Sequence, residues 1–91
     1  MIKSFRTKET RAIFDGEPVL KFQNVAGVAR RKLRSIHQAR TLRDLALPGN
    51  RLEALKGDRV GRHGVRINDQ YRVCFVWDNG DAFAVEIVDY H

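Results

Sequence analysis

The Asp-Asn-Gly-Asp sequence at residues 78–81 constrains the possible folds more than any other part of the chain. It separates two apolar runs rich in β-branched and aromatic residues, at 70–77 and 82–88. An Asn-Gly pair between two such runs is the strongest short-range signal for a β-hairpin, because both central residues of the turn must adopt positive φ. We therefore expect a two-residue loop in which Asp78 pairs with Asp81.

The register of this hairpin would bring polar side chains together. With a two-residue loop, Arg72 lies opposite Ile87, and Asp89 becomes its diagonal neighbour on the same face. His91 follows two residues later and projects to the same side if the extended chain continues. The grouping depends on loop length, because a shift of one residue moves every side chain to the other face of the sheet.

Two further β-type runs precede the hairpin, at residues 51–55 and 63–67. Asn68-Asp69 separates the second of them from the run at 70–77 and favours another turn. A two-residue loop there gives two more expected pairs: Val65 opposite Arg72, and His63 opposite Cys74.

The N-terminal part predicts a short strand at residues 2–5 followed by two helices. The first helix covers residues 7–14, with Thr7 as its N-cap, and Pro18 discourages its continuation. The second helix starts from Asn24 as a candidate cap. Its apolar stripe recurs at three- and four-residue spacing: Val25, Val28, Ala29, Leu33 and Ile36.

A short helical turn over residues 41–45 is expected from Thr41 and Asp44, which resemble a capping box. The resulting β-α-α-β-β-β-β order predicts an α+β fold. Two N-terminal helices pack on one face of a mainly antiparallel sheet of four to five strands. The length of 91 residues fits one domain, residues 1–91.

Positive charge is concentrated in the first four fifths of the chain. Residues 1–72 carry all 17 Lys and Arg against seven acids, whereas residues 73–91 carry four acids and no Lys or Arg. A net charge of +6 with this asymmetry favours a polyanionic partner: nucleic acid first, acidic protein second and anionic lipid third.

Cations gather on the predicted second helix and in the segment 51–72. The sequence Lys-Gly-Asp-Arg at 56–59 predicts a turn, and a cation on a tight loop beside a sheet can be held close to a phosphate. The expected contacts with RNA are Arg30, Arg31, Lys32, Arg34, Arg59 and Arg62.

Several classes of protein are excluded. The single cysteine, Cys74, lies in an apolar run and is expected in the core, and no disulfide within the chain is possible. No apolar run approaches the ~18 residues of a membrane span and no secretory signal is visible, so we expect a cytoplasmic protein. No cysteine or carboxylate stands at metal-ligand spacing from His37 or His63, which argues against a zinc site. The sequence also lacks a phosphate-binding loop, a dinucleotide-binding fingerprint and a serine-nucleophile motif. We expect no metal and no cofactor.

Three motifs in order resemble a known family. They are Asn-Arg-Leu-Glu-Ala-Leu-Lys-Gly-Asp-Arg-Val-Gly at 50–61, Asn-Asp-Gln-Tyr-Arg-Val-Cys-Phe at 68–75 and Val-Glu-Ile-Val-Asp-Tyr-His at 85–91. Together with the N-terminus they closely resemble the HigB (host inhibition of growth) toxins of the RelE superfamily, over essentially the whole chain. The resemblance implies the compact RelE arrangement of sheet and helices.

The function implied by the resemblance is that of a type II toxin. Such a toxin is a small, metal-independent endoribonuclease that enters the ribosomal A site, cuts translated mRNA and stops translation and growth. Its partners would be the ribosome with its rRNA, the mRNA, and a cognate HigA-like antitoxin, a helix-turn-helix DNA-binding protein. The toxin would meet operator DNA only through that antitoxin.

The family's site residues match five positions here: Lys56, Arg72, Asp89, Tyr90 and His91. Some members carry a histidine three residues before the loop lysine, and this chain has Glu53 there.

RNA cleavage without a metal needs a base for the 2′-OH, positive charge on the phosphorane and an acid for the leaving oxygen. The hypothesis assigns proton transfer to Asp89 or His91, phosphate contacts to Arg72 and Lys56, and orientation of the nucleotide to Tyr90.

Three alternatives remain open: a non-catalytic module that binds RNA or DNA, a gyrase-poisoning toxin of the same superfamily, and a domain that binds an acidic protein.

Overall fold

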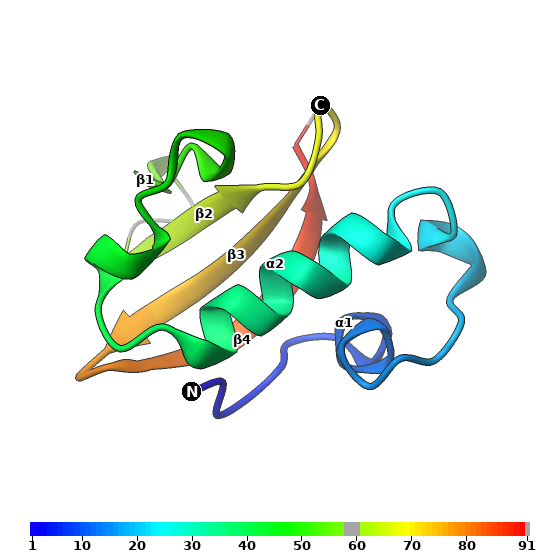
Figure 1. Cartoon of the computed structure of the whole chain (residues 1–91), viewed down its shortest axis with the longest axis horizontal. Coiled ribbons are helices and arrows are strands. Elements are labelled where there is room, and N and C mark those ends of the chain that lie inside the picture. The colour runs from blue at the N-terminus through cyan, green and yellow to red at the C-terminus, as the bar shows by residue number, and fades with distance from the viewer. Residues whose placement is uncertain (58–60, 91) are drawn as a thin grey trace.

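The structure is a computed structural model that describes residues 1–57 and 61–90. Within them, two helices cover one face of a four-stranded antiparallel sheet with the order β1-β2-β3-β4 (Figure 1). The strands are β1 (Glu53–Ala54), β2 (Arg62–Arg66), β3 (Tyr71–Asp78) and β4 (Asp81–Asp89). The helices are α1 (Lys8–Phe14) and α2 (Ala26–Gln38), with 3₁₀ turns η1 (Leu20–Phe22), η2 (Leu42–Leu45) and η3 (Pro48–Asn50). The predicted α+β class is confirmed.

The helix-capping predictions differ in outcome. Thr7 caps α1, its hydroxyl accepting from Thr10 N at 3.2 Å, as predicted. The capping box also forms, with Asp44 Oδ2 accepting from Thr41 N at 3.2 Å. The Asn24 cap is wrong, because α2 begins at Ala26, after an N-cap position that makes no side-chain hydrogen bond.

The N-terminal segment does not form the predicted strand. It makes two isolated parallel bridges to β4, Ile2 with Ala82 and Phe5 with Val85. Its backbone bonds, such as Arg6 N to Val85 O at 2.9 Å, occupy the edge of β4 that faces away from β3. The first residues therefore cover a sheet edge that would otherwise be unpaired.

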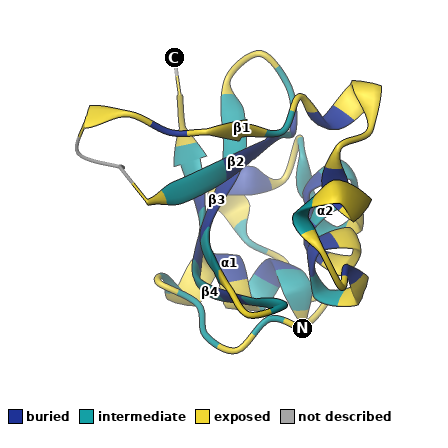
Figure 2. Cartoon of the chain, turned by 90° about the vertical axis from the view of Figure 1, so that its left-hand side faces the viewer, coloured by how far each residue is buried: buried dark blue, intermediate teal, exposed yellow. Residues whose placement is uncertain are grey.

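The core lies between the helices and the sheet. From the helices it takes Ile13, Ala29, Leu33 and Ile36, and from the sheet Val65, Val73, Phe75, Val85 and Ile87. The apolar stripe predicted for the second helix is thus the face that α2 turns towards the sheet (Figure 2).

The β3–β4 hairpin begins as predicted and then changes register. Asp78 pairs with Asp81, and Asn79 and Gly80 both have positive φ, 51° and 85°. Further along, Cys74 pairs with Glu86, because a bulge puts one extra residue into β4. Ala84, with φ of 51°, lies at this bulge. The bulge keeps Ala82, Val85 and Ile87 all buried, which strict alternation would not allow.

Two register predictions are therefore wrong. Arg72 lies opposite Val88 rather than Ile87, and Asp89 pairs with Tyr71, so Asp89 points to the face opposite Arg72.

The β2–β3 pairing also differs by one residue from the prediction. Arg66, not Val65, lies opposite Arg72, and Gly64, not His63, lies opposite Cys74. The cause is a three-residue loop: Ile67 N donates to Tyr71 O at 3.0 Å.

Candidate active site

We call the sheet face turned away from α1 and α2 the outer face. By strand register, it carries Glu53, Arg62, Gly64, Arg66, Arg72, Cys74, Val76, Glu86 and Val88. In Figure 2 the sheet is seen from the side, with α2 on one side of it. The outer face is the part of the sheet on which charged side chains lie close together.

Arg72 lies at the centre of this group. Its Nη1 is 3.1 Å from Glu53 Oε1, and its Cζ is 4.5 Å from the centroid of the Tyr90 ring. The two neighbours come from opposite edges of the sheet, Glu53 from β1 and Tyr90 from the residue after β4. A cation over an aromatic ring at this distance is attracted by the π face.

Arg72 is largely buried, and its contact with Glu53 is imperfect. Its side chain is only 16% exposed, and Nη1, although 3.1 Å from Glu53 Oε1, makes no well-formed hydrogen bond with the described residues. A buried donor left without a hydrogen bond costs about 1–3 kcal/mol. An anion reaches Nη1 only if the neighbouring side chains move, because this atom is shielded from solvent.

Gly64 makes room for this arrangement on β2. A Cβ at this position would meet Leu55 Cδ2 at 3.3 Å and Arg72 Cδ at 3.8 Å. The lack of a side chain lets Leu55 pack closely on β2 beside the aliphatic part of Arg72. Lys56 follows Leu55 directly and is exposed.

Tyr90 continues the line of β4 beyond its last residue. Its backbone N–H donates to Gln70 O at 2.6 Å, and its ring is about half exposed beside Arg72. Asp89 instead accepts from Gln70 Nε2 at 3.2 Å, on the other side of the strand. The structure therefore brings Arg72 and Tyr90 together, but not Asp89.

Glu53 is the site residue that sequence reasoning did not select. It was noted only as a departure from the family pattern, whereas the structure makes it the acidic partner of Arg72. The signal was available, because Glu53 stands three residues before Lys56, the position at which the family resemblance implies a histidine in some members.

The basic residues of α2 lie on the helical side of the sheet, away from Arg72. Lys32 Nζ donates to Asn50 Oδ1 at 2.6 Å. Burial lowers the pKa of Lys32, with smaller contributions from the charges of Arg31 and Arg66. Lys32 thus ties α2 to η3, whereas Arg31 and Arg34 are exposed.

Arg62 also lies on the outer face, but its guanidinium already forms an ion pair with Glu86. Its Nη1 is 3.1 Å from Glu86 Oε2, and both side chains are nearly buried, at 15% and 12% exposed. Arg6 approaches the same carboxylate at 3.6 Å. Two other predicted site residues, Arg59 and His91, lie outside the described residues.

In the described part of the chain, no group of three or more His, Cys, Asp or Glu side chains is placed to hold a metal ion. No helix there is long and apolar enough to cross a membrane.

Solved structures show the same fold. The YoeB–YefM toxin–antitoxin complex from Staphylococcus aureus contains a chain with a TM-score of 0.62 and 15% identity, covering 100% of this chain and 98% of that one. The YoeB dimer from the same organism has a TM-score of 0.61 and 16% identity, with 99% and 94% covered.

Sequence comparisons identify the family. The "Endoribonuclease HigB" of Proteus vulgaris is 33% identical over 96 residues, covering 100% of both chains. The "Toxin HigB-1" of Vibrio cholerae serotype O1 is 43% identical over 53 residues, covering 57% of this chain and 56% of that protein. Residues 3–91 match the model of the family described as "RelE-like toxin of type II toxin-antitoxin system HigB". The chain therefore belongs to the HigB-like toxins of type II toxin–antitoxin systems.

Proposed function

We propose that this toxin is an endoribonuclease that cleaves translated mRNA in the ribosomal A site, in the cytoplasm, and thereby stops growth. The observation that carries the proposal is Arg72, a largely buried cation held between the Glu53 carboxylate and the half-exposed Tyr90 ring. The full-length similarity to an endoribonuclease supports it.

Arg72 is proposed to bind the scissile phosphate. A guanidinium in a partly buried site stabilises the charge that develops on the phosphorane more strongly than it would in water. Lys56, exposed on the segment after β1, would contact a second non-bridging oxygen. Positive charge is then supplied by the protein without a metal.

Glu53 is proposed as the base that takes the proton from the 2′-OH. It is the carboxylate beside Arg72, and at 46% exposed it is open to a ligand. When a phosphate replaces Glu53 as the partner of Nη1, the carboxylate is left next to the ribose. Asp89 fits this role less well because it lies on the opposite face.

Tyr90 and His91 complete the proposal. The half-exposed Tyr90 ring offers a face for stacking a base, a contact of about 1–3 kcal/mol. His91 would donate the proton to the leaving 5′-oxygen, a role that its sequence position next to Tyr90 and imidazole chemistry support.

Binding to the ribosome is proposed to use the exposed cations of α2, Arg31 and Arg34, as contacts with rRNA phosphates. Lys32 and Arg62 are less suitable because Asn50 and Glu86 already hold them. The partner that neutralises the toxin would be a HigA-like antitoxin with a helix-turn-helix domain, which alone would contact operator DNA.

The test is Arg72→Ala in a translation reaction, with new 5′ ends of the mRNA mapped by primer extension. We expect cleavage to fall on the order of 10²–10³-fold. Arg43→Ala, which removes an exposed cation of η2, is the matched control and should cleave normally.

Other outcomes would support a different function. Inhibited translation without new 5′ ends, even with the unmodified toxin, would indicate a non-catalytic RNA-binding protein. DNA breaks with intact mRNA would indicate a gyrase poison. Normal cleavage by Arg72→Ala would refute the assignment of the site.

A further inference from the structure

A groove of about 550 Å³ opens between the segment that follows α1 and the first turns of α2. Its lining is mostly apolar and includes Pro18, Val19, Leu20, Gln23, Ala26 and Arg30. Leu20 is 82% exposed, more than any other large hydrophobic residue in the described part of the chain. A single exposed leucine is ordinary on a protein surface, but Leu20 borders an apolar groove, and apolar surface that is contiguous in this way marks interaction sites.

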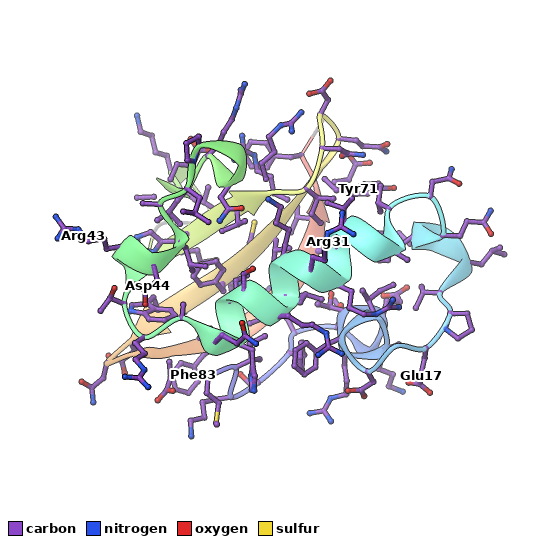
Figure 3. The ribbon with its side chains drawn as sticks, viewed as in Figure 1. Glu17, Arg31, Arg43, Asp44, Tyr71 and Phe83 are labelled. Atoms are coloured by element: carbon purple, nitrogen blue, oxygen red, sulfur yellow. The ribbon has the colours of Figure 1, made fainter. Side chains whose placement is uncertain are left out.

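This groove is separate from the candidate active site. All of its lining residues come from positions 16–30, in the helical layer, whereas Arg72 lies on the outer face of the sheet. Glu17, one of the lining residues, is labelled in Figure 3 on the segment between α1 and α2. A partner seated here need not touch Arg72.

Positive charge predominates beside the groove: its lining holds one acid and one base, Glu17 and Arg30, and two further cations, Lys21 and Arg34, lie close by in the sequence. Arg30 and Arg34 follow Ala26 at four-residue spacing, so they lie along one side of α2. Arg30 is fixed there, because its Nε donates to Ile13 O at 2.9 Å. Among the described residues, neither these two cations nor Lys21 forms an ion pair with an acid.

The charge and the apolar lining together select the kind of partner. A second copy of this chain would bring the same basic surface against itself across a two-fold axis. RNA phosphates could pair with the cations, but RNA would leave Leu20 and the apolar lining uncovered, because the aromatic ring of this segment, Phe22, is 3% exposed and offers no stacking face. A protein segment with an apolar side chain flanked by carboxylates matches both properties.

We propose that this groove docks the cognate antitoxin, through a segment that places an apolar side chain against Leu20 and acidic side chains beside Arg30 and Arg34. The inference rests on the proposed toxin function, because it takes the antitoxin as the partner. Beyond naming the antitoxin as the partner, the inference identifies the face of the toxin to which the antitoxin binds and the chemistry of the antitoxin segment that binds there.

The test compares Leu20→Lys with Leu47→Lys, which changes another exposed leucine, 58% exposed, outside the groove. Both are made in an Arg72→Ala background so that cells survive expression. The probe is the antitoxin encoded beside the toxin gene, titrated calorimetrically. We expect Leu20→Lys to raise the Kd on the order of 10- to 100-fold, the loss expected for one buried leucine, and Leu47→Lys to leave it unchanged.

A charge reversal provides a second arm. Arg34→Glu should raise the Kd, whereas Arg43→Glu, also on an exposed residue, should not. If Leu20→Lys does not fold, this pair decides the question.

Three results would overturn the proposal. They are an unchanged Kd for both Leu20→Lys and Arg34→Glu, an effect of Leu20→Lys on ribosome binding alone, or a toxin dimer that Leu20→Lys dissociates in sedimentation.

Failure of the proposed function would look different. In the otherwise unmodified toxin, Leu20→Lys should cleave mRNA at the normal rate while escaping the antitoxin. If neither protein cleaves mRNA but the groove variants still lose the antitoxin, the nuclease assignment fails and the docking face stands.

Discussion

Replacing Thr10 with valine tests how α1 supports the strand that leads to the candidate site. Thr10 is fully buried, and its hydroxyl accepts a hydrogen bond from Ile87 N at 3.0 Å. The same hydroxyl is 2.7 Å from the Thr7 hydroxyl, which caps α1. One side chain thus joins the helix start to β4, three residues before Tyr90.

The cost of the change follows from this geometry. Valine keeps the shape of threonine but leaves the Ile87 N–H buried without an acceptor, a penalty of about 1–3 kcal/mol. For a domain of this size each kcal/mol lowers Tm by about 4–8 °C. We therefore expect Thr10→Val to lower Tm by roughly 4–24 °C.

The assay is thermal and urea unfolding followed by far-UV circular dichroism, in the Arg72→Ala background. Ser35→Ala is the control, since that exposed hydroxyl only donates to Arg31 O within α2, and it should stay within about 0.5 kcal/mol of the parent. A free energy of unfolding for Thr10→Val equally close to the parent would refute the reasoning, because Ile87 N–H would then have another partner.

Three further predictions concern charged side chains. Glu53→Gln should lower mRNA cleavage, measured by primer extension, by about 10²–10⁴-fold, while ribosome binding, measured by co-sedimentation, stays normal. An equal loss of cleavage and binding would argue against Glu53 as the general base. Arg62→Met should destabilise the fold by about 1.5–3 kcal/mol in urea, because it removes the cation that lies 3.1 Å from the nearly buried Glu86 carboxylate. No change would mean that the other contacts of Glu86, including Arg6, compensate. Hydrogen bonds from the backbone N–H groups of Arg40 and Thr41 lower the pKa of Asp44 below its usual 3.8. Its stabilisation is therefore present above that value and lost as the pH falls through the lower folded-state pKa. Asp44→Asn should lower Tm at neutral pH, and the difference from the parent should shrink as the pH falls below the folded-state pKa.

The secondary structure was largely predictable because it depends on local rules. Asn79 and Gly80 adopt the positive φ that their hairpin requires, and Thr7 caps the helix that follows it. The apolar stripe that includes Leu33 packs on the sheet as its spacing indicates. These features are governed by residues close together in the chain.

The register was not predictable in the same way. Residues 82–85 are all apolar, so the sequence does not show which of them point to the core and which to the outer face. The position of the bulge was therefore not predictable. The β2–β3 loop took three residues because Asn68 Oδ1 accepts from both Gln70 N and Tyr71 N. A local side-chain bond thus changed which residues face Arg72.

By itself the sequence determined the α+β class, the order of the two helices and the four strands that follow them, the concentration of cations and the family. Only the tertiary structure decided that Glu53, and not Asp89, is the carboxylate beside Arg72. The physical reason is that one extra residue in β4 moves every later side chain of the strand to the opposite face. The position of this bulge depends on which apolar side chains of β4 the core buries.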